Sequence, residues 1–264
     1  MLNVTISDGV MRLVLDRPDA KNALTAEMRD GITDAVRAAR ANPDVRCVLV
    51  TGAGDAFCSG MDLSASTVMQ AGSPDFRPRQ TSEALRSGVQ SFIRELWELD
   101  KPTVAVVNGA AVGPGAHLAL ACDFVLAHTA TKFIWTFPKW GLVVDAGGAY
   151  LLPRLVGLQK AKALVMLGET VVGNDAVAAG LALECYDDLD SLRSAGDALC
   201  ATLASGPTRS LGLSKRLLNT SFESDLTASL ETEGHFQALA TASPDLLAGM
   251  AGFKEKRSPE FNGD

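Results

Sequence analysis

The sequence predicts an α/β protein in which strands buried on both faces alternate with helices. The stretch VRCVLVT at residues 45–51 is mostly apolar, as in a strand of a parallel sheet that is covered on both sides. Two further apolar stretches, Thr103–Val107 and Phe124–Ala127, are also strand candidates. Helical patterns lie between these stretches, so we expect stacked β-β-α units.

The chain opens with two short strand candidates, Asn3–Ile6 and Met11–Asp16, joined by a turn at Asp8-Gly9. A helix is expected over Thr25–Ala41, because apolar residues recur there on one helical face. The segment Ser64–Gln80 lacks periodicity and holds one glycine and two prolines, which predicts a mobile loop beside the site. Another helix is expected directly afterwards, over residues 82–99.

After Tyr186 the sequence pattern becomes wholly helical, with no further strand candidate. The expected helices are Leu189–Ser205, Pro207–Leu218, Glu223–Leu239 and Pro244–Lys254. We therefore expect a core over residues 1–189 and a helical C-terminal subdomain over residues 190–264.

Composition narrows the functional classes. The 24 basic and 31 acidic residues give a net charge of −7, which disfavours nucleic acid as a partner. No apolar run reaches the roughly 18–20 residues of a membrane span, and the chain begins without a recognisable signal peptide. Five scattered cysteines without a CxxC pair indicate reduced thiols and a cytoplasmic location. Three widely separated histidines predict no metal site.

Two local features point to chemistry. The turn Gly113-Pro114-Gly115 joins an apolar strand to a helix starting near Ala116, and N–H groups at such a junction can hold an anion or oxyanion. Asp145 is a lone acid in an apolar segment, where desolvation raises a carboxyl pKa toward the range useful for proton transfer. The same position also suits a simple helix N-cap, and the local sequence leaves both interpretations open.

Five segments in order resemble the crotonase superfamily, also called the enoyl-CoA hydratase/isomerase family. They are LDRPDAKNAL (15–24), CVLVTGAGDAFCSGMDL (47–63), KPTVAVVNGAAVGPGAHLALACD (101–123), DAGGAYLLPRLVG (145–157) and FKEKRSPEF (253–261). The resemblance covers nearly the whole chain. It implies a spiral of β-β-α turns, C-terminal helices that support trimers or dimers of trimers, and an acyl-CoA thioester substrate. No permanently bound cofactor is implied, since coenzyme A arrives as part of the substrate.

The family stabilises an enolate on the thioester oxygen with two backbone N–H groups, which form an oxyanion hole. By motif position the first donor is the N–H of Met61. The second falls on Pro114, which has no N–H. Either Gly115 N–H takes over, or one direct donor acts with help from the helix N-terminus, or the protein handles thioesters weakly. Proline is well tolerated in the first turn of a helix, and this structural role for Pro114 is compatible with all three possibilities.

The acid–base residues also depart from the hydratase pattern. The two glutamates that hydratases use fall on His117 and Phe137, so ordinary hydration is disfavoured. Asp145 stands where family isomerases carry a proton-shuttling aspartate, and the surrounding residues resemble the branch that isomerises unsaturated acyl-CoAs, including 1,2-epoxyphenylacetyl-CoA isomerases. His117 is either a second acid–base group near neutral pH or an uncharged, hydrogen-bonded helix residue.

The resemblance also implies contacts with the substrate. These implied contacts are Lys21, Ala23, Leu24, Ser59, Gly60, Asp62, Leu63, Val112, Gly113, Trp135, Phe137, Leu142, Phe253 and Lys256. Lys21 or Arg17 would face the CoA phosphates, unless each is a solvated loop charge. Trp135 and Phe137 line the acyl pocket or belong to the plain core. We expect an isomerase; the alternatives are a hydratase that uses His117 with Asp145, and a weakly catalytic acyl-CoA-binding protein.

Overall fold

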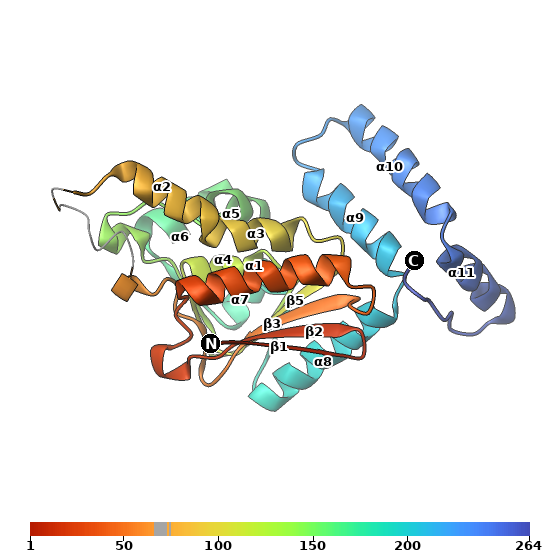
Figure 1. Ribbon diagram of the computed structural model, residues 1–264, viewed down its shortest axis with the longest axis horizontal. Helices are drawn as coiled ribbons and strands as arrows, with labels where there is room; N and C mark the ends of the chain where they lie inside the picture. Colours follow the sequence, from red (N-terminus) through yellow and green to blue (C-terminus); the bar gives the residue numbers. More distant parts are fainter. Residues whose placement is uncertain (66–72, 74) are drawn as a thin grey trace.

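The computed structural model describes residues 1–65, 73 and 75–264 and shows an α/β protein (Figure 1). Its larger sheet has six strands in the order β1-β2-β3-β5-β7-β10. The strands are β1 (Leu2–Ser7), β2 (Val10–Leu15), β3 (Cys47–Gly52), β5 (Thr103–Val107), β7 (Phe124–His128) and β10 (Glu184–Tyr186). All neighbours pair in parallel except β1 and β2, whose antiparallel hairpin turns at Asp8-Gly9. Both turn residues have positive φ, 51° and 76°, as a tight hairpin turn requires.

A second sheet of four short strands lies beside the first, in the order β4-β6-β8-β9. The strands are β4 (Ala56–Cys58), β6 (Ala110–Val112), β8 (Lys132–Ile134) and β9 (Thr170–Val172). A long strand of the first sheet is followed by a short strand of the second in β3–β4, β5–β6 and β7–β8. This repetition confirms the expected β-β-α organisation.

Helix α1 (Ala26–Ala41) begins at Thr25, whose side chain accepts a hydrogen bond from the Met28 N–H. The single helix expected over residues 82–99 is wrong, because the structure has α2 (Pro78–Ser87) and α3 (Val89–Trp97), separated at Gly88. Gly88 has a φ of −95° and a ψ of −108°, outside the helical region, so the helix ends there. Residues 78–80 of the expected loop belong to α2, and residues 66–72 and 74 lie outside the described part of the chain.

Further helices complete the core region. They are α4 (Pro114–Leu120), α5 (Gly148–Val156), α6 (Leu158–Leu167) and α7 (Asn174–Ala178). Helices α1, α3 and α4 lie over one face of the larger sheet, and α8 (Leu189–Ser205) covers the other (Figure 1). Residues of α8 such as Leu192 and Cys200 pack against Val104 and Val106 of β5. The expected boundary at residue 189, between the core and the C-terminal subdomain, stays a prediction. Helix α8, which lies almost wholly beyond that boundary, packs directly on the larger sheet.

The last three helices extend away from the sheets (Figure 1). They are α9 (Thr208–Thr220), α10 (Leu226–Thr241) and α11 (Pro244–Glu255), so the expected helical C-terminal region is confirmed. Helix α9 is anchored by Lys215, whose buried ammonium donates to the carbonyl oxygens of Leu96 and Lys101. No helix within residues 1–65, 73 and 75–264 has both the length and the apolar character of a membrane span.

Candidate active site

Asp145 stands in the turn between the short 3-10 helix Phe137–Trp140 and α5. Burial raises the pKa of its carboxyl to about 6. One carboxylate oxygen, Oδ1, is buried and has no hydrogen-bond partner among the described residues. The N-cap of α5 is Gly147, so Asp145 does not cap that helix. A partly desolvated carboxyl with one unpartnered oxygen is suited to exchanging a proton.

The turn that carries Asp145 has an unusual backbone. Ala146 has a φ of 46° and Gly147 a φ of 78°, both in the left-handed region. Alanine rarely adopts this conformation, because its Cβ crowds the following carbonyl oxygen. The Asp145 carbonyl oxygen accepts a hydrogen bond from the Gly148 N–H over 2.9 Å, which closes the turn. Packing must hold this turn, since its backbone is not intrinsically preferred.

His117 of α4 is fully buried close to the same turn. The Trp135 Nε1–H donates to His117 Nε2 over 3.1 Å, and the His117 ring stacks on Phe137 with centroids 5.9 Å apart and planes 7° apart. Burial lowers the pKa of His117 to about 3, and the backbone of Asp145 acts in the opposite direction. A Cβ at Gly148 would lie 2.2 Å from the His117 Cε1, so the ring sits directly against the start of α5. The structure therefore brings His117 and Asp145 together.

The Trp135–His117 hydrogen bond is a feature that sequence reasoning missed. The sequence predicts Trp135 only as a pocket or core residue. A general signal was available, since a buried indole N–H needs an acceptor and His117 offers one. The two residues are 18 positions apart, and the sequence alone does not indicate that they meet.

The two segments expected to form the oxyanion hole adjoin each other. Met61 forms a parallel bridge with Leu24, in which Leu24 N–H donates to Gly60 and Asp62 N–H donates to Leu24. In a parallel bridge of this kind the N–H of the central residue, Met61, points to the opposite side. A Cβ at Gly60 would lie 3.6 Å from Pro114 Cδ, which places the Met61 segment beside the turn that opens α4.

Pro114 is the first residue of α4, where the missing N–H costs no helical hydrogen bond. The preceding residue, Gly113, has a φ of 50°, and Val112 ends β6 directly before it. A Cβ at Gly113 would lie 3.5 Å from the Phe137 ring, which also stacks on His117. The α4 turn, His117 and the Asp145 turn therefore form one continuous region.

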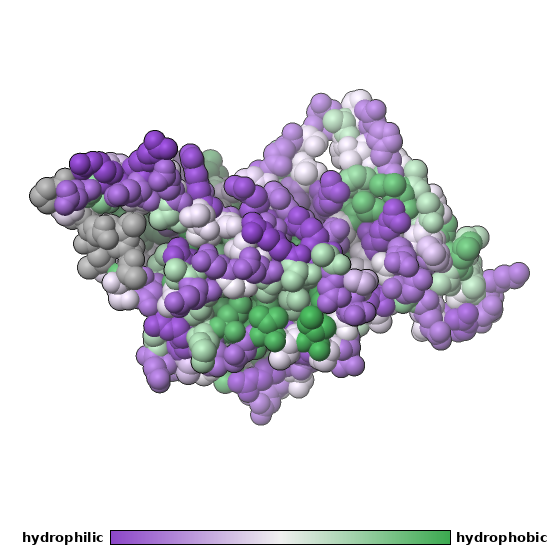
Figure 2. Space-filling view, viewed as in Figure 1, coloured by the Kyte–Doolittle hydropathy of each residue, from purple (hydrophilic) through white to green (hydrophobic). Residues whose placement is uncertain are grey.

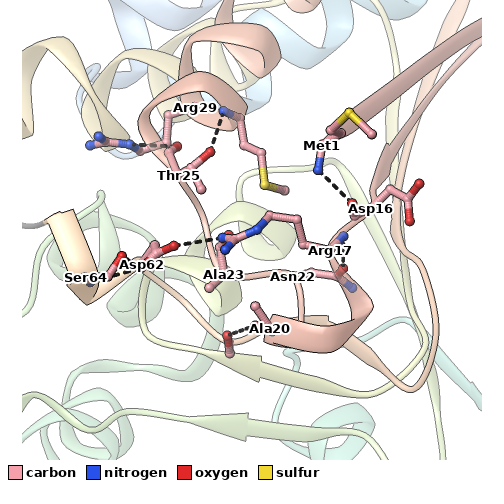
Figure 3. Close-up of polar contacts among 12 residues, drawn as sticks. Met1, Asp16, Arg17, Ala20, Asn22, Ala23, Thr25, Arg29, Asp62 and Ser64 are labelled. Carbon is pink, nitrogen blue, oxygen red and sulfur yellow. Dashed lines mark hydrogen bonds and ion pairs between the residues drawn. The ribbon is translucent and has the colours of Figure 1, made fainter.

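The loop expected to meet CoA is held rigidly by Arg17 (Figure 3). The Arg17 guanidinium donates to the Ala23 carbonyl oxygen and forms an ion pair with Asp62, each over 2.9 Å. Hydrogen bonds from Ser64, together with Arg17, lower the pKa of Asp62 to about 2. Arg17 thus has internal partners, whereas Lys21 pairs with the exposed Asp55 over 2.6 Å.

Asn22 is a second organising residue of this loop, and sequence reasoning did not single it out. Its buried side-chain amide donates to the carbonyl oxygens of Ala53 and Ala56 and accepts from the Arg17 N–H. Lys21 and Asn22 both have positive φ, 50° and 57°. Asparagine tolerates this conformation better than most residues, so its place in the loop was a usable signal.

The remaining expected contacts differ in exposure. Trp135 and Phe137 are buried, whereas Leu142 is exposed. The Ser59 N–H donates a hydrogen bond to the Lys21 carbonyl oxygen. Leu63 begins a 3-10 turn at Leu63–Ala65. In α11, Phe253 is 90% exposed and Lys256 caps the helix, far from α5 within one chain (Figure 1).

Comparison with known proteins agrees with this arrangement. The enoyl-CoA hydratase/isomerase family matches residues 5–264. The 1,2-epoxyphenylacetyl-CoA isomerase of Escherichia coli (strain K12) is 36% identical over 259 residues, which cover 98% of this chain and 97% of that protein. A Rhodobacter capsulatus protein named "Probable enoyl-CoA hydratase" is 35% identical over 258 residues, covering 98% and 96%.

A solved structure supports the same conclusion. The enoyl-CoA hydratase from Bacillus anthracis has a TM-score of 0.91 at 27% identity, covering 100% of this chain and 99% of that one. The resemblance inferred from the five sequence segments is thus confirmed at the level of sequence and fold. This chain is an enzyme of the enoyl-CoA hydratase/isomerase family, the crotonase superfamily, whose substrates are acyl-CoA thioesters.

Proposed function

We propose that this enzyme isomerises a carbon–carbon double bond of an unsaturated acyl-CoA, with Asp145 as the proton shuttle. The observation that carries the proposal is the buried, unpartnered Asp145 oxygen, with a carboxyl pKa raised to about 6. A base with a pKa near the working pH combines sufficient ionisation with sufficient basicity. Moving one proton between two carbons needs only one such group.

In the proposed reaction the Asp145 carboxylate removes the α-proton of a 3-enoyl-CoA, or the γ-proton of a 2-enoyl-CoA in the reverse direction. The electrons move onto the thioester oxygen as an enolate, and the same carboxyl returns the proton to the other end of the allylic unit. The substrate gains and loses nothing overall. Met61 N–H is proposed as the first oxyanion donor and Gly115 N–H as the second, in place of the N–H that Pro114 lacks.

Hydration remains the alternative reaction, and a relative bearing a hydratase name supports keeping it. It would pair His117 with Asp145. However, burial lowers the pKa of His117 to about 3 and Trp135 occupies its Nε2 atom, so His117 is poorly suited to proton exchange near neutral pH. A weakly catalytic acyl-CoA-binding protein is the third candidate, favoured only by Pro114.

The test is mass spectrometry of products from 2-enoyl- and 3-enoyl-CoAs incubated in D2O. We expect a shifted double bond without added water, and deuterium in the product wherever the Asp145 carboxyl exchanges its proton with D2O before returning it. Asp145→Asn should lower turnover by about a hundredfold or more, the low end for a lost general base, while the exposed Asp30→Asn serves as the matched control. Gain of water would establish hydration instead. Unchanged turnover in Asp145→Asn would remove Asp145 from the mechanism.

We further propose that the loop Ala20–Leu24 and residues 59–63 bind the CoA portion of the substrate.

Helices α10 and α11 carry apolar surface (Figure 2). Their exposed apolar residues are Leu226, Leu230, Leu239, Leu246, Leu247, Met250 and Phe253. Such a surface fits a homo-oligomer, a trimer or a dimer of trimers, in which Phe253 and Lys256 reach a neighbouring chain's substrate. A cytoplasmic location fits the buried thiols of Cys47, Cys58, Cys122 and Cys200.

A further inference from the structure

His117 is a buried polar residue that the proposed proton shuttle does not use. Its Nε2 accepts the Trp135 indole hydrogen over 3.1 Å, and both side chains are fully buried. An indole N–H only donates, so Nε2 must be unprotonated and the hydrogen of the neutral ring must sit on Nδ1. The protein core therefore fixes the tautomer.

The His117 ring lies firmly between two structural elements. Phe137 stacks parallel to it, with planes 7° apart. On the α5 side, Gly148 offers no side chain, and a Cβ there would lie 2.2–2.3 Å from the ring atoms Cε1 and Nε2. The ring thus occupies space that any other residue at position 148 would need. A displacement of the ring would be transmitted to the start of α5.

The Asp145 turn needs such support. Ala146 is fully buried and has a left-handed φ of 46°. This backbone conformation costs about 1–3 kcal/mol in a residue other than glycine and persists only where the surrounding structure imposes it. The Asp145 main chain interacts with the His117 ring. The remaining ring nitrogen, Nδ1, is buried and has no hydrogen-bond partner in the described part of the chain.

We infer that His117 is a positioning residue, held by Trp135, that sets the Asp145–Gly148 turn and thereby the place of the Asp145 carboxylate. This inference rests on the isomerase function proposed above. The ring interacts with the Asp145 main chain and fills the space against Gly148, so it blocks collapse of the turn toward α4. His117 itself exchanges no proton with the substrate.

Kinetics provide the first test. His117→Leu removes both ring nitrogens, and Trp135→Phe removes only the indole donor; each should lower kcat by up to about a hundredfold, the cost of a misplacement of roughly 1 Å. KM should change little, because the CoA-binding loops are untouched. His117→Gln should retain kcat within a few-fold, since its amide can accept from Trp135 and still donate. The matched controls, His235→Gln and Trp97→Phe, alter the same residue types elsewhere.

The pH profile separates positioning from acid–base catalysis. If His117 only positions Asp145, the limb due to Asp145 persists in His117→Gln and His117→Leu. A role as acid or base predicts that His117→Gln loses as much activity as His117→Leu, together with one limb of the profile. That result would overturn the inference, as would wild-type kcat in His117→Leu.

Nitrogen NMR of ¹⁵N-histidine-labelled wild-type enzyme reads the tautomer of His117 directly, without relying on activity. The chain has three histidines, so the His117 signals are assigned by their loss in His117→Gln. We expect a protonated Nδ1 and an unprotonated Nε2 across the stable pH range, and a change of tautomer in Trp135→Phe. A proton on Nε2 in the wild type would overturn the inference. If Asp145→Asn leaves turnover intact while the tautomer is as expected, the isomerase mechanism fails and the Trp135–His117 geometry stands.

Discussion

Lys215 Nζ of α9 lies 3.0 Å from Asp123 Oδ2, at the start of β7. The lysine ammonium also donates to two carbonyl oxygens, and its side chain is 7% exposed. Asp123 Oδ2 additionally accepts from the Thr103 N–H and hydroxyl. This cluster joins the first of the projecting helices to the larger sheet.

Lys215→Met should therefore destabilise the protein by about 2–4 kcal/mol, because it leaves the carbonyl oxygens of Leu96 and Lys101 without a donor and removes the cation beside Asp123. Urea unfolding measures the change in the free energy of unfolding. The exposed Lys254→Met is the matched control and should change that free energy by less than about 0.5 kcal/mol. A loss below about 1 kcal/mol in Lys215→Met would show that the cluster does not anchor α9.

The activity should depend on pH through Asp145. The raised carboxyl pKa of about 6 means that the free enzyme loses its base as pH falls through this value. We expect kcat/KM to rise with pH and level off above about pH 7, because kcat/KM reports ionisations of the free enzyme. A profile that is flat between pH 5 and 7 would contradict the assignment of Asp145 as base.

The ionised Asp145 carboxylate should also lower the free energy of unfolding at neutral pH. A carboxyl whose folded pKa of about 6 exceeds its ordinary value of 3.8 favours folding below pH 4, and this contribution is lost as pH rises through 6. Asp145→Asn should therefore raise the free energy of unfolding by about 1–3 kcal/mol more at pH 8 than at pH 4. Thermal unfolding at both pH values measures this difference. Equal effects at the two pH values would mean that burial does not raise the pKa.

The Asn22 amide should stabilise the loop that is proposed to bind CoA. Asn22→Ala leaves the Ala53 and Ala56 carbonyl oxygens without that donor and places alanine, which tolerates the left-handed region less well than asparagine, at a φ of 57°. We expect a loss of about 2–4 kcal/mol in unfolding free energy and a raised KM for acyl-CoA. Asn22→Gly keeps the backbone freedom and isolates the hydrogen bonds. Unchanged KM in a folded Asn22→Ala variant would separate the loop from CoA binding.

Pro114→Ala tests which group completes the oxyanion hole. The substitution adds an N–H at the position where the family pattern has its second donor. If Gly115 N–H already serves, kcat should change less than about threefold. A rise of tenfold or more would indicate that the natural enzyme works with one direct donor, since a donor in such a site contributes a factor of about 10²–10³. Steady-state kinetics with the preferred enoyl-CoA decides between them.

Much of the fold was available from the sequence because long elements repeat their pattern. The strand β5 matches the expected range, and α1 and α8 lie within one residue of theirs. The strands β4, β6, β8, β9 and β10 were missed, since three residues are too few to display alternation. The break at Gly88 was missed because a single glycine inside a helical pattern does not by itself mark the end of a helix.

For the site, the sequence by itself determined which residues bear chemical groups: the apolar flanks of Asp145, the absent N–H of Pro114, and the lack of a glutamate at positions 117 and 137. Only the tertiary structure decided what those groups meet. Gly147 rather than Asp145 caps α5, and Trp135 fixes the tautomer of His117. The physical reason is that desolvation and hydrogen bonding depend on neighbours in space, and parallel pairing of β6 with β8 is what places Trp135 beside α4.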